Sequence, residues 1–142
     1  MLTTIILIAV IIASLAFLII RARNRMKSIQ DIPDSQKIRV LNDQNFSNTI
    51  KKGTVLVDFW AAWCMPCKLM VPVLNELAEE SDGRFTVGKL NVDEARKTAS
   101  HFGIRSIPTM IIFRNGKELK RIVGVKNTEY LLREMDRLEN FR

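Results

Sequence analysis

The sequence contains few of the residues that build metal centres and disulfide scaffolds. Its 142 residues include two cysteines and one histidine, His101. Two cysteines are too few for the disulfide framework of a small secreted protein, and with His101 they fall short of the four ligands of a closed zinc site. No G-x-G-x-x-G follows a predicted strand, so we expect no dinucleotide-binding loop. We therefore expect neither a metal ion nor a bound cofactor, and we assign no role to His101.

Charge is absent from the first twenty residues. Leu2–Ile20 consists mostly of Ile, Leu, Val and Ala and has no charged side chain. As a helix this stretch would span about 28 Å, close to the thickness of the hydrocarbon core of a bilayer. A buried core helix is disfavoured because the run is apolar on every side. The sequence therefore predicts a single transmembrane anchor over residues 1–20.

A cleaved signal peptide is the main alternative to an anchor. Such a peptide needs basic residues before its apolar run and a small-residue cleavage site. No Lys or Arg precedes Leu2, and the only small-x-small pattern, Ser14 to Ala16, lies inside the apolar run. Cleavage there would leave an apolar end on the mature protein. An uncleaved anchor in the lipid bilayer is therefore the favoured interpretation.

Positive charge is concentrated directly after the apolar run. The net charge is +7, but four basic residues are Arg21, Arg23, Arg25 and Lys27, and the chain from Ser28 onward has 18 basic and 15 acidic residues. This near balance argues against a nucleic-acid-binding face. Because basic residues beside a membrane span stay on the cytoplasmic side, we predict a cytoplasmic C-terminal domain. An extracytoplasmic domain is the alternative.

The rest of the chain divides into a linker and one domain. Residues 21–36 are predicted to form a basic juxtamembrane segment and a polar linker with Pro33, and residues 37–142 the domain. Strands alternate with helices in the order βαβαβαββα, which predicts an α/β fold with parallel crossovers and a final antiparallel hairpin at Asn115-Gly116. The strands are expected at 37–41, 54–60, 85–92, 109–114 and 117–123, and the helices at about 43–52, 64–81, 94–102 and 127–140.

Both cysteines lie in one C-x-x-C motif, Cys64-Met65-Pro66-Cys67. The motif follows a predicted buried strand and begins a helix. Cys64 would therefore meet unpaired N–H groups and the positive end of the helix dipole, which favour thiolate over thiol. The alternatives are a structural disulfide and two inert thiols. A disulfide that closes so short a loop gains little stability, and a permanent disulfide is rare in the cytoplasm.

From about Ile38 to the C-terminus the sequence resembles the thioredoxins. The segments that carry this resemblance, in order, are Val57-Asp58-Phe59-Trp60-Ala61, Trp63-Cys64-x-Pro66-Cys67-Lys68, Pro72, Lys89-Leu90-Asn91-Val92-Asp93, Gly103 to Thr109 and Phe113 to Gly124. Met65 is a departure, since thioredoxins usually have Gly at that position. The resemblance implies a thioredoxin fold, in which helices flank a central mixed β-sheet. It also implies a thiol–disulfide oxidoreductase with a redox-active Cys64–Cys67 disulfide.

The resemblance implies roles for the residues around the cysteines. Asp58 is the one charged residue in an apolar strand, so we expect it to be buried with a raised pKa. By resemblance it accepts the proton of Cys67, and Lys89 modulates its charge. The Ile107–Pro108 bond is implied to be cis and to lie against the cysteines. The residues implied to border the substrate groove are Trp63, Met65, Pro66, Ile107 and Gly124.

We predict that the protein reduces partner disulfides by dithiol–disulfide exchange. The resemblance implies disulfide-containing substrate proteins, a thioredoxin reductase as electron donor and a monomeric domain. The alternative is a membrane-tethered binding or scaffold module in which redox activity is incidental. The joint presence of Asp58, Cys64, Cys67 and Pro108 favours the enzyme.

Overall fold

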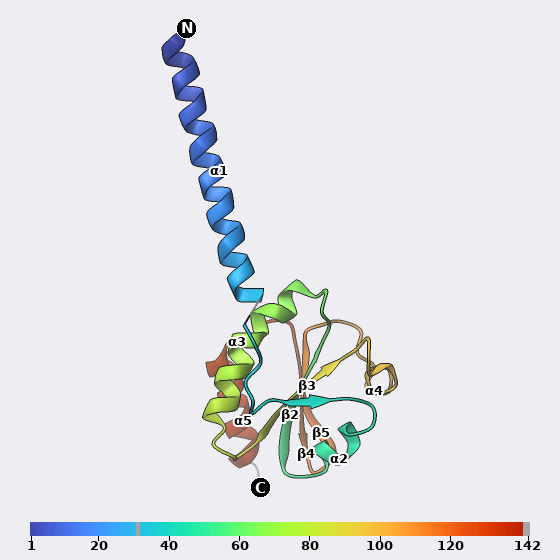
Figure 1. Cartoon of the computed structure of the whole chain (residues 1–142). Coiled ribbons are helices and arrows are strands. Elements are labelled where there is room, and N and C mark those ends of the chain that lie inside the picture. The colour runs from blue at the N-terminus through green and yellow to red at the C-terminus, as the bar shows by residue number, and fades with distance from the viewer. Residues whose placement is uncertain (31, 141–142) are drawn as a thin grey trace. The chain divides into compact units, whose positions relative to one another are not determined.

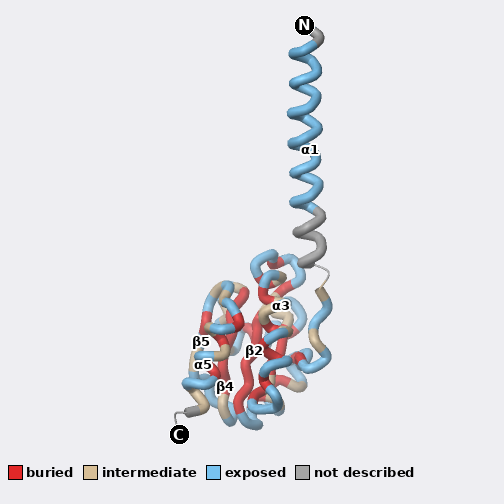
Figure 2. The backbone as a smooth tube through the Cα atoms, turned by 90° about the vertical axis from the view of Figure 1, so that its left-hand side faces the viewer, coloured by how far each residue is buried: buried red, intermediate tan, exposed pale blue. Residues whose placement is uncertain are grey.

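The computed structural model describes residues 1–30 and 32–140, and it describes only the backbone of Leu2, residues 24–30 and Asn140. The chain forms two units that divide after Ile32. The first unit contains the helix α1 (Leu2–Gln30), which is exposed along its described length (Figures 1 and 2). The second unit begins at Pro33 and holds every strand that the structure describes.

Helix α1 continues ten residues beyond the end of the apolar run. The predicted basic juxtamembrane segment and the first residues of the predicted linker, as far as Gln30, are therefore helical, because Arg, Lys and Met are good helix formers. The side chains of Arg25 and Lys27 lie outside the described residues. Within α1, Thr3–Arg23 has a mean hydropathy of 3.0 and is long and apolar enough to cross a membrane. A signal sequence near the N-terminus would satisfy the same criterion.

The second unit is built on a five-stranded sheet with helices on both faces (Figure 1). Its strands lie in the order β1-β3-β2-β4-β5, of which β1, β3 and β2 run parallel to one another. The α/β class and the mixed sheet are confirmed. The strands are β1 (Arg39–Leu41), β2 (Thr54–Trp60), β3 (Thr86–Asn91), β4 (Thr109–Arg114) and β5 (Lys117–Val123), and the helices are α2 (Phe46–Ile50), α3 (Met65–Glu80), α4 (Arg96–His101) and α5 (Thr128–Asn140).

Strand β4 runs in a direction that the alternation of strands and helices does not predict. Alternation favours parallel neighbours, whereas β4 pairs antiparallel with β2 through Phe59 and Thr109. Strand β3 ends at Asn91, beside Trp60, so the chain leaves β3 and enters β4 at the same end of the sheet. Helix α4 has six residues, about 9 Å, and is too short to return the chain along strands of about 20 Å.

The turn between β4 and β5 has the conformation that its sequence predicts. Asn115 and Gly116 both have left-handed backbones, with φ of 49° and 83°. A two-residue hairpin loop of type I′ requires this conformation at both positions, and Asn and Gly adopt it most readily. The strands on either side pair antiparallel, beginning with Arg114 and Lys117. The predicted hairpin is therefore confirmed.

Alternate residues of β2 face two separate parts of the core, which Figure 2 shows as the buried interior of the domain. Leu56 packs in the cluster that includes Leu74 of α3 and Leu131 of α5. Val57 and its neighbours on the opposite face pack with α2 and with residues beside α4. Because side chains alternate along a strand, Asp58 shares the face of Leu56. The sequence thus places a carboxylate under α3.

We expect Leu74→Ala to lower the free energy of unfolding by about 2–5 kcal/mol, because a fully buried side chain of α3 would leave a cavity. Leu69→Ala is the matched control, since Leu69 lies on the same helix with about half of its surface exposed. Urea unfolding of the full chain in detergent micelles would measure both. Equal losses for the two variants would contradict the packing described for α3.

Candidate active site

The two cysteines lie where strand β2 gives way to helix α3. Cys64 is the N-cap residue of α3, and Cys67 lies in the first turn. Their sulfur atoms form a disulfide with an S–S distance of 2.05 Å and a Cα–Cα distance of 5.3 Å. In this oxidised form Cys64 is 3% exposed and Cys67 is 2% exposed. The redox pair predicted from the sequence is therefore formed in the structure.

The start of α3 directs a backbone dipole and an N–H group at Cys64. The N–H of Cys67 donates a hydrogen bond to Cys64 Sγ over 3.2 Å. Pro66 occupies the first turn, where its missing N–H costs little. Because α3 has 16 residues, its aligned peptide dipoles place partial positive charge at this end. On reduction, these groups stabilise a thiolate on Cys64, which is the form that attacks disulfides.

The loop that precedes β4 packs against the cysteines. Ile107 contacts the small buried cluster formed by Ala61, Cys64 and Cys67. The Ile107–Pro108 peptide bond is cis, as the resemblance implies. The carbonyl oxygen of Pro108 accepts a hydrogen bond from the N–H of Gly124 over 2.9 Å. These contacts bring together three of the residues expected at the substrate groove or beside the cysteines.

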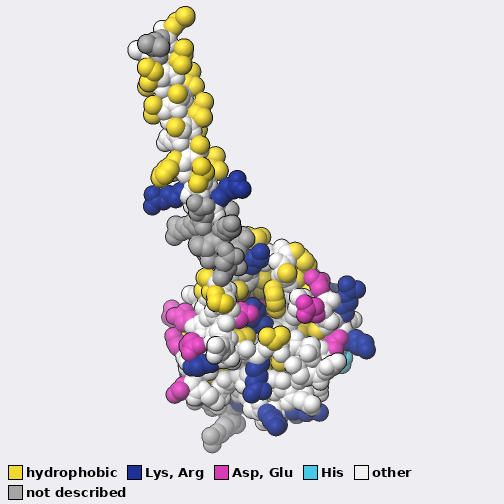
Figure 3. Space-filling view, viewed as in Figure 1, with side chains coloured by type: hydrophobic (Ala, Val, Ile, Leu, Met, Phe, Trp, Pro, Cys, Tyr) yellow, Lys and Arg dark blue, Asp and Glu magenta, His cyan; other side chains and the backbone are white. Residues whose placement is uncertain are grey.

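Exposed apolar side chains surround the buried disulfide. Trp63 is 69% exposed, and Met65, Pro66 and Leu69 are exposed beside it. The Nε1–H of Trp63 donates to Asp93 Oδ2 over 2.9 Å, which ties the indole ring to the chain just after β3. Figure 3 shows hydrophobic side chains on the surface at this end of the domain. Such a rim can bind an extended, partly apolar partner segment next to the sulfur atoms.

Asp58 is fully buried, and neither of its carboxylate oxygens has a hydrogen-bond partner among the described residues. Burial raises the pKa of Asp58 to about 7, and the positive charge of Lys89 partly opposes this effect. Asp58 and Lys89 lie opposite each other in the parallel pairing of β2 with β3. The carboxyl is therefore buried and its pKa raised, as expected for a lone charge in an apolar strand. An acid whose pKa lies near neutrality can exchange protons at physiological pH.

Lys89 does not form its ion pair with Asp58. Its ammonium nitrogen bonds to both carboxylate oxygens of Asp34, at 2.6 and 2.9 Å. It also lies 4.5 Å from the centre of the Trp60 ring, in a cation–π contact. Lys89 is 5% exposed, so Asp34 neutralises a nearly buried charge. The resemblance implies a lysine beside Asp58 but gives no indication of Asp34.

Sequence reasoning missed two residues of this site, Asp34 and Asp93. Asp93 ends a segment that carries the family resemblance, so its position after β3 was a usable signal. Asp34 lies in a polar segment, 55 residues from Lys89, and no local pattern marks it. Among the described residues, no group of three His, Cys, Asp or Glu side chains could hold a metal ion.

Comparisons with known proteins agree with this geometry. Residues 37–137 match the family model of thioredoxin. The chain is 52% identical over 92 residues to a thioredoxin from Alicyclobacillus acidocaldarius subsp. acidocaldarius, an alignment that covers 64% of this chain and 88% of the relative. It is 45% identical over 97 residues to a thioredoxin from Staphylococcus haemolyticus (strain JCSC1435), covering 68% and 93% of the two chains.

A solved structure shares the fold as well. A mutant thioredoxin from Halobacterium salinarum NRC-1 superimposes with a TM-score of 0.66 at 29% sequence identity, covering 75% of this chain and 94% of that one. The family match, the identities and the disulfide at the start of α3 point to one chemistry. The chain belongs to the thioredoxin family and is a thiol–disulfide oxidoreductase.

Proposed function

We propose that the protein is a membrane-anchored reductase of protein disulfides. The observation that carries the proposal is the position of Cys64, whose sulfur receives a backbone N–H at the start of α3 while Cys67 lies one turn further in. This asymmetry gives the two sulfurs different tasks. Cys64 is the attacking thiolate, and Cys67 is the thiol that resolves the intermediate.

The reaction takes place in two exchanges. First, the Cys64 thiolate attacks one sulfur of the substrate disulfide, which forms a Cys64–substrate disulfide and releases the other substrate sulfur as a thiolate. Second, the Cys67 thiolate attacks Cys64 Sγ, which forms the Cys64–Cys67 disulfide and releases the second substrate sulfur. The substrate gains two electrons and two protons, and the enzyme loses them. An external dithiol reductant must restore Cys64 and Cys67, and a thioredoxin reductase has the required chemistry.

Asp58 is the base that prepares Cys67 for the second exchange. Asp58 and Trp60 share the face of β2 that carries Leu56 and packs against α3, and Trp60 packs against the cluster that contains Cys67. A carboxylate whose pKa is about 7 holds a proton weakly enough to release it and strongly enough to take one from a thiol. We assign the transfer to a bridging water, because Asp58 has no protein donor among the described residues. Lys89 modulates the charge of Asp58. Pro108 holds the backbone of Ile107 against the cysteine cluster.

The groove for the substrate lies along the exposed rim. We assign to this groove Trp63, Met65 and Pro66, which are exposed beside the disulfide. Ile107, which packs against the cysteine cluster, and Gly124, which donates to the carbonyl of Pro108, complete it. Met65 adds a flexible apolar side chain beside Cys64, which favours contact with partners of varied shape. Substrates are therefore folded or partly folded proteins with an accessible disulfide.

The N-terminal helix supplies the anchor in this proposal. Thr3–Arg23 has the length and hydropathy of a membrane span. The four basic residues that follow the span favour a cytoplasmic domain. Basic side chains beside an anionic leaflet contribute about 1 kcal/mol each to this orientation. A cytoplasmic domain would also have direct access to a soluble reductase.

Cys67→Ser should accumulate mixed disulfides with substrate proteins, because the first exchange proceeds and the second lacks its nucleophile. Cys64→Ser should accumulate none. Non-reducing electrophoresis of the full-length variants after thiol quenching would show the adducts, with the double Ser variant as the background control. Adducts on Cys64→Ser and none on Cys67→Ser would reverse the two assignments.

Asp58→Asn should stabilise the protein at pH 8 by about 1–3 kcal/mol, because it removes an unpaired buried carboxylate. The folded pKa of about 7 lies above the ordinary value of 3.8. The folded state therefore binds more protons between these values, and the free energy of unfolding of the wild type falls as pH rises. The gain should be near zero at pH 4. Urea unfolding at pH 4, 6 and 8 would measure it.

The same Asp58→Asn variant should resolve mixed disulfides more slowly than the wild type near pH 7, while the first attack by Cys64 keeps its rate. Stopped-flow Trp fluorescence with a disulfide peptide would separate the two exchanges. Unchanged resolution together with pH-independent stability would remove Asp58 from the mechanism.

A membrane-impermeant maleimide added to intact cells should leave reduced Cys64 and Cys67 unlabelled, and permeabilised cells should become labelled. The orientation follows the basic residues, so neutral residues at Arg21, Arg23, Arg25 and Lys27, combined with Thr3→Lys and Thr4→Lys, should invert it. Labelling of wild-type Cys64 from outside would place the domain on the extracytoplasmic side. Loss of the N-terminal apolar run from the mature chain would show a signal sequence instead.

A further inference from the structure

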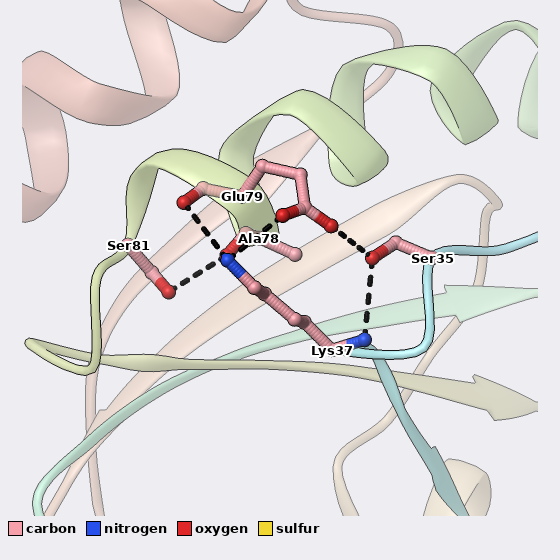
Figure 4. Close-up of polar contacts among 5 residues, drawn as sticks. All are labelled: Ser35, Lys37, Ala78, Glu79 and Ser81. Carbon is pink, nitrogen blue, oxygen red and sulfur yellow. Dashed lines mark hydrogen bonds and ion pairs between the residues drawn. The ribbon is translucent and has the colours of Figure 1, made fainter.

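The residues between α1 and β1 are bonded to the outer side of α3. The backbone N–H of Ser35 donates to Asn75 Oδ1 over 2.7 Å, and Asn75 Nδ2 donates to the carbonyl of Pro33 over 2.8 Å. The Ser35 hydroxyl donates to Glu79 over 2.6 Å, and Lys37 forms an ion pair with the same carboxylate at 2.8 Å (Figure 4). We call residues 33–37 the docked segment.

The docked segment places the carboxylate of Asp34 against Lys89, the lysine of the redox site. Asp34 lies between the bonded residues Pro33 and Ser35, and its two oxygens hold the ammonium of Lys89. The Asp34 side chain is 35% exposed, whereas Lys89 is 5% exposed. An exposed ion pair contributes little to a protein, but a nearly buried ammonium is costly without a partner. The Lys89 ammonium therefore needs a carboxylate partner, and two carboxylates lie near it, those of Asp34 and Asp58.

The other candidate carboxylate is Asp58, which faces Lys89 across the β2–β3 pairing. The charges that shift the pKa of Asp58 are Lys89, which lowers it, and Asp34, which raises it. On the remaining sides, β4 presents Met110, and Cys67 of α3 is in the disulfide. Most acids of α3 and α5 have partners of their own: Glu76 bonds to Thr128, Glu79 to Ser35 and Lys37, Glu129 to Arg133, Glu134 to Lys120, and Asp136 and Glu139 to Arg84. Glu80, at the end of α3, is exposed.

We propose that Asp34 is a positioning residue of the redox site, which holds the Lys89 ammonium and thereby sets how tightly Asp58 binds its proton. Without Asp34, Lys89 would turn its charge to Asp58 and stabilise the carboxylate form. Asp34 lies outside residues 37–137, the part that matches the thioredoxin family model. Its importance for turnover rests on the proposed role of Asp58 as proton acceptor.

The docked segment is thus a part of the redox site and not a passive linker, because its contacts with Asn75 and Glu79 keep Asp34 in place. Any event that pulls residues 33–37 from α3 would also free Lys89.

Asp34→Asn should lower the proton affinity of Asp58 about tenfold, because an unpaired cation within a few ångströms favours the carboxylate. The full-length oxidised protein in detergent micelles, labelled with ¹³C at aspartate side chains, would report the Asp58 titration by NMR. The wild-type midpoint is expected at about 7, and the variant midpoint at lower pH. Asp34→Glu keeps the charge and should restore the wild-type midpoint.

Asp136→Asn is the matched control, because it removes one carboxylate from an ion pair with Arg84 on the surface and should leave the Asp58 midpoint unchanged. A midpoint that stays at its wild-type value in Asp34→Asn would overturn the proposal, as would an equal shift in Asp136→Asn. The Asp34→Asn variant is expected to fold, because the bonds of Ser35 and Lys37 to Glu79 do not involve the Asp34 side chain. Unchanged signals of the other aspartate side chains in the same spectra would verify this.

The rate of mixed-disulfide resolution separates this proposal from the proposed role of Asp58. A shift in both the NMR midpoint and the pH profile of resolution supports both. A shifted midpoint with an unshifted pH profile supports the action of Asp34 on Asp58 and removes Asp58 from the reaction. An unshifted midpoint in an active enzyme overturns the role of Asp34 alone.

Discussion

A strand covered on both faces has no place for an unpaired charge, and β2 nevertheless carries Asp58. The rest of β2 is apolar or nearly so and fills two hydrophobic clusters. The carboxyl of Asp58 has no donor among the described residues and a pKa of about 7. The fold tolerates this group because the sheet around it is well packed, and the destabilising carboxyl lies at the position for which we propose a base.

The second requirement is a sulfur atom that attacks readily, and the junction of β2 with α3 meets it. The strand ends at Trp60, and the helix that begins at Met65 directs its first N–H groups back toward Cys64. Burial that raises the pKa of Asp58 and a helix dipole that stabilises a thiolate act on groups a few residues apart. Burial in the strand thus favours a protonated Asp58, whereas the start of the helix favours a deprotonated Cys64.

Local patterns in the sequence predict most of this arrangement and miss its long-range parts. The strands, the Asn115-Gly116 turn and the start of α3 follow from hydrophobic periodicity and turn chemistry, which act between near neighbours. The direction of β4 depends on where β3 ends, and the helical state of residues 21–30 depends on intrinsic propensity in a charged segment. The pairing of Asp34 with Lys89 joins residues 55 apart, and no periodic pattern encodes it.

The shared lysine explains why the site extends beyond the part that resembles the family. One ammonium cannot fully neutralise two carboxylates, so the carboxylate with better geometry receives the charge. Asp34 binds Lys89 through both oxygens and remains partly solvated, whereas Asp58 is fully desolvated and fixed in a strand. The exposed acid therefore holds the cation at lower cost, and the buried acid keeps its affinity for a proton. In this proposal the residues before the first strand contribute to the acid–base balance of the cysteine pair.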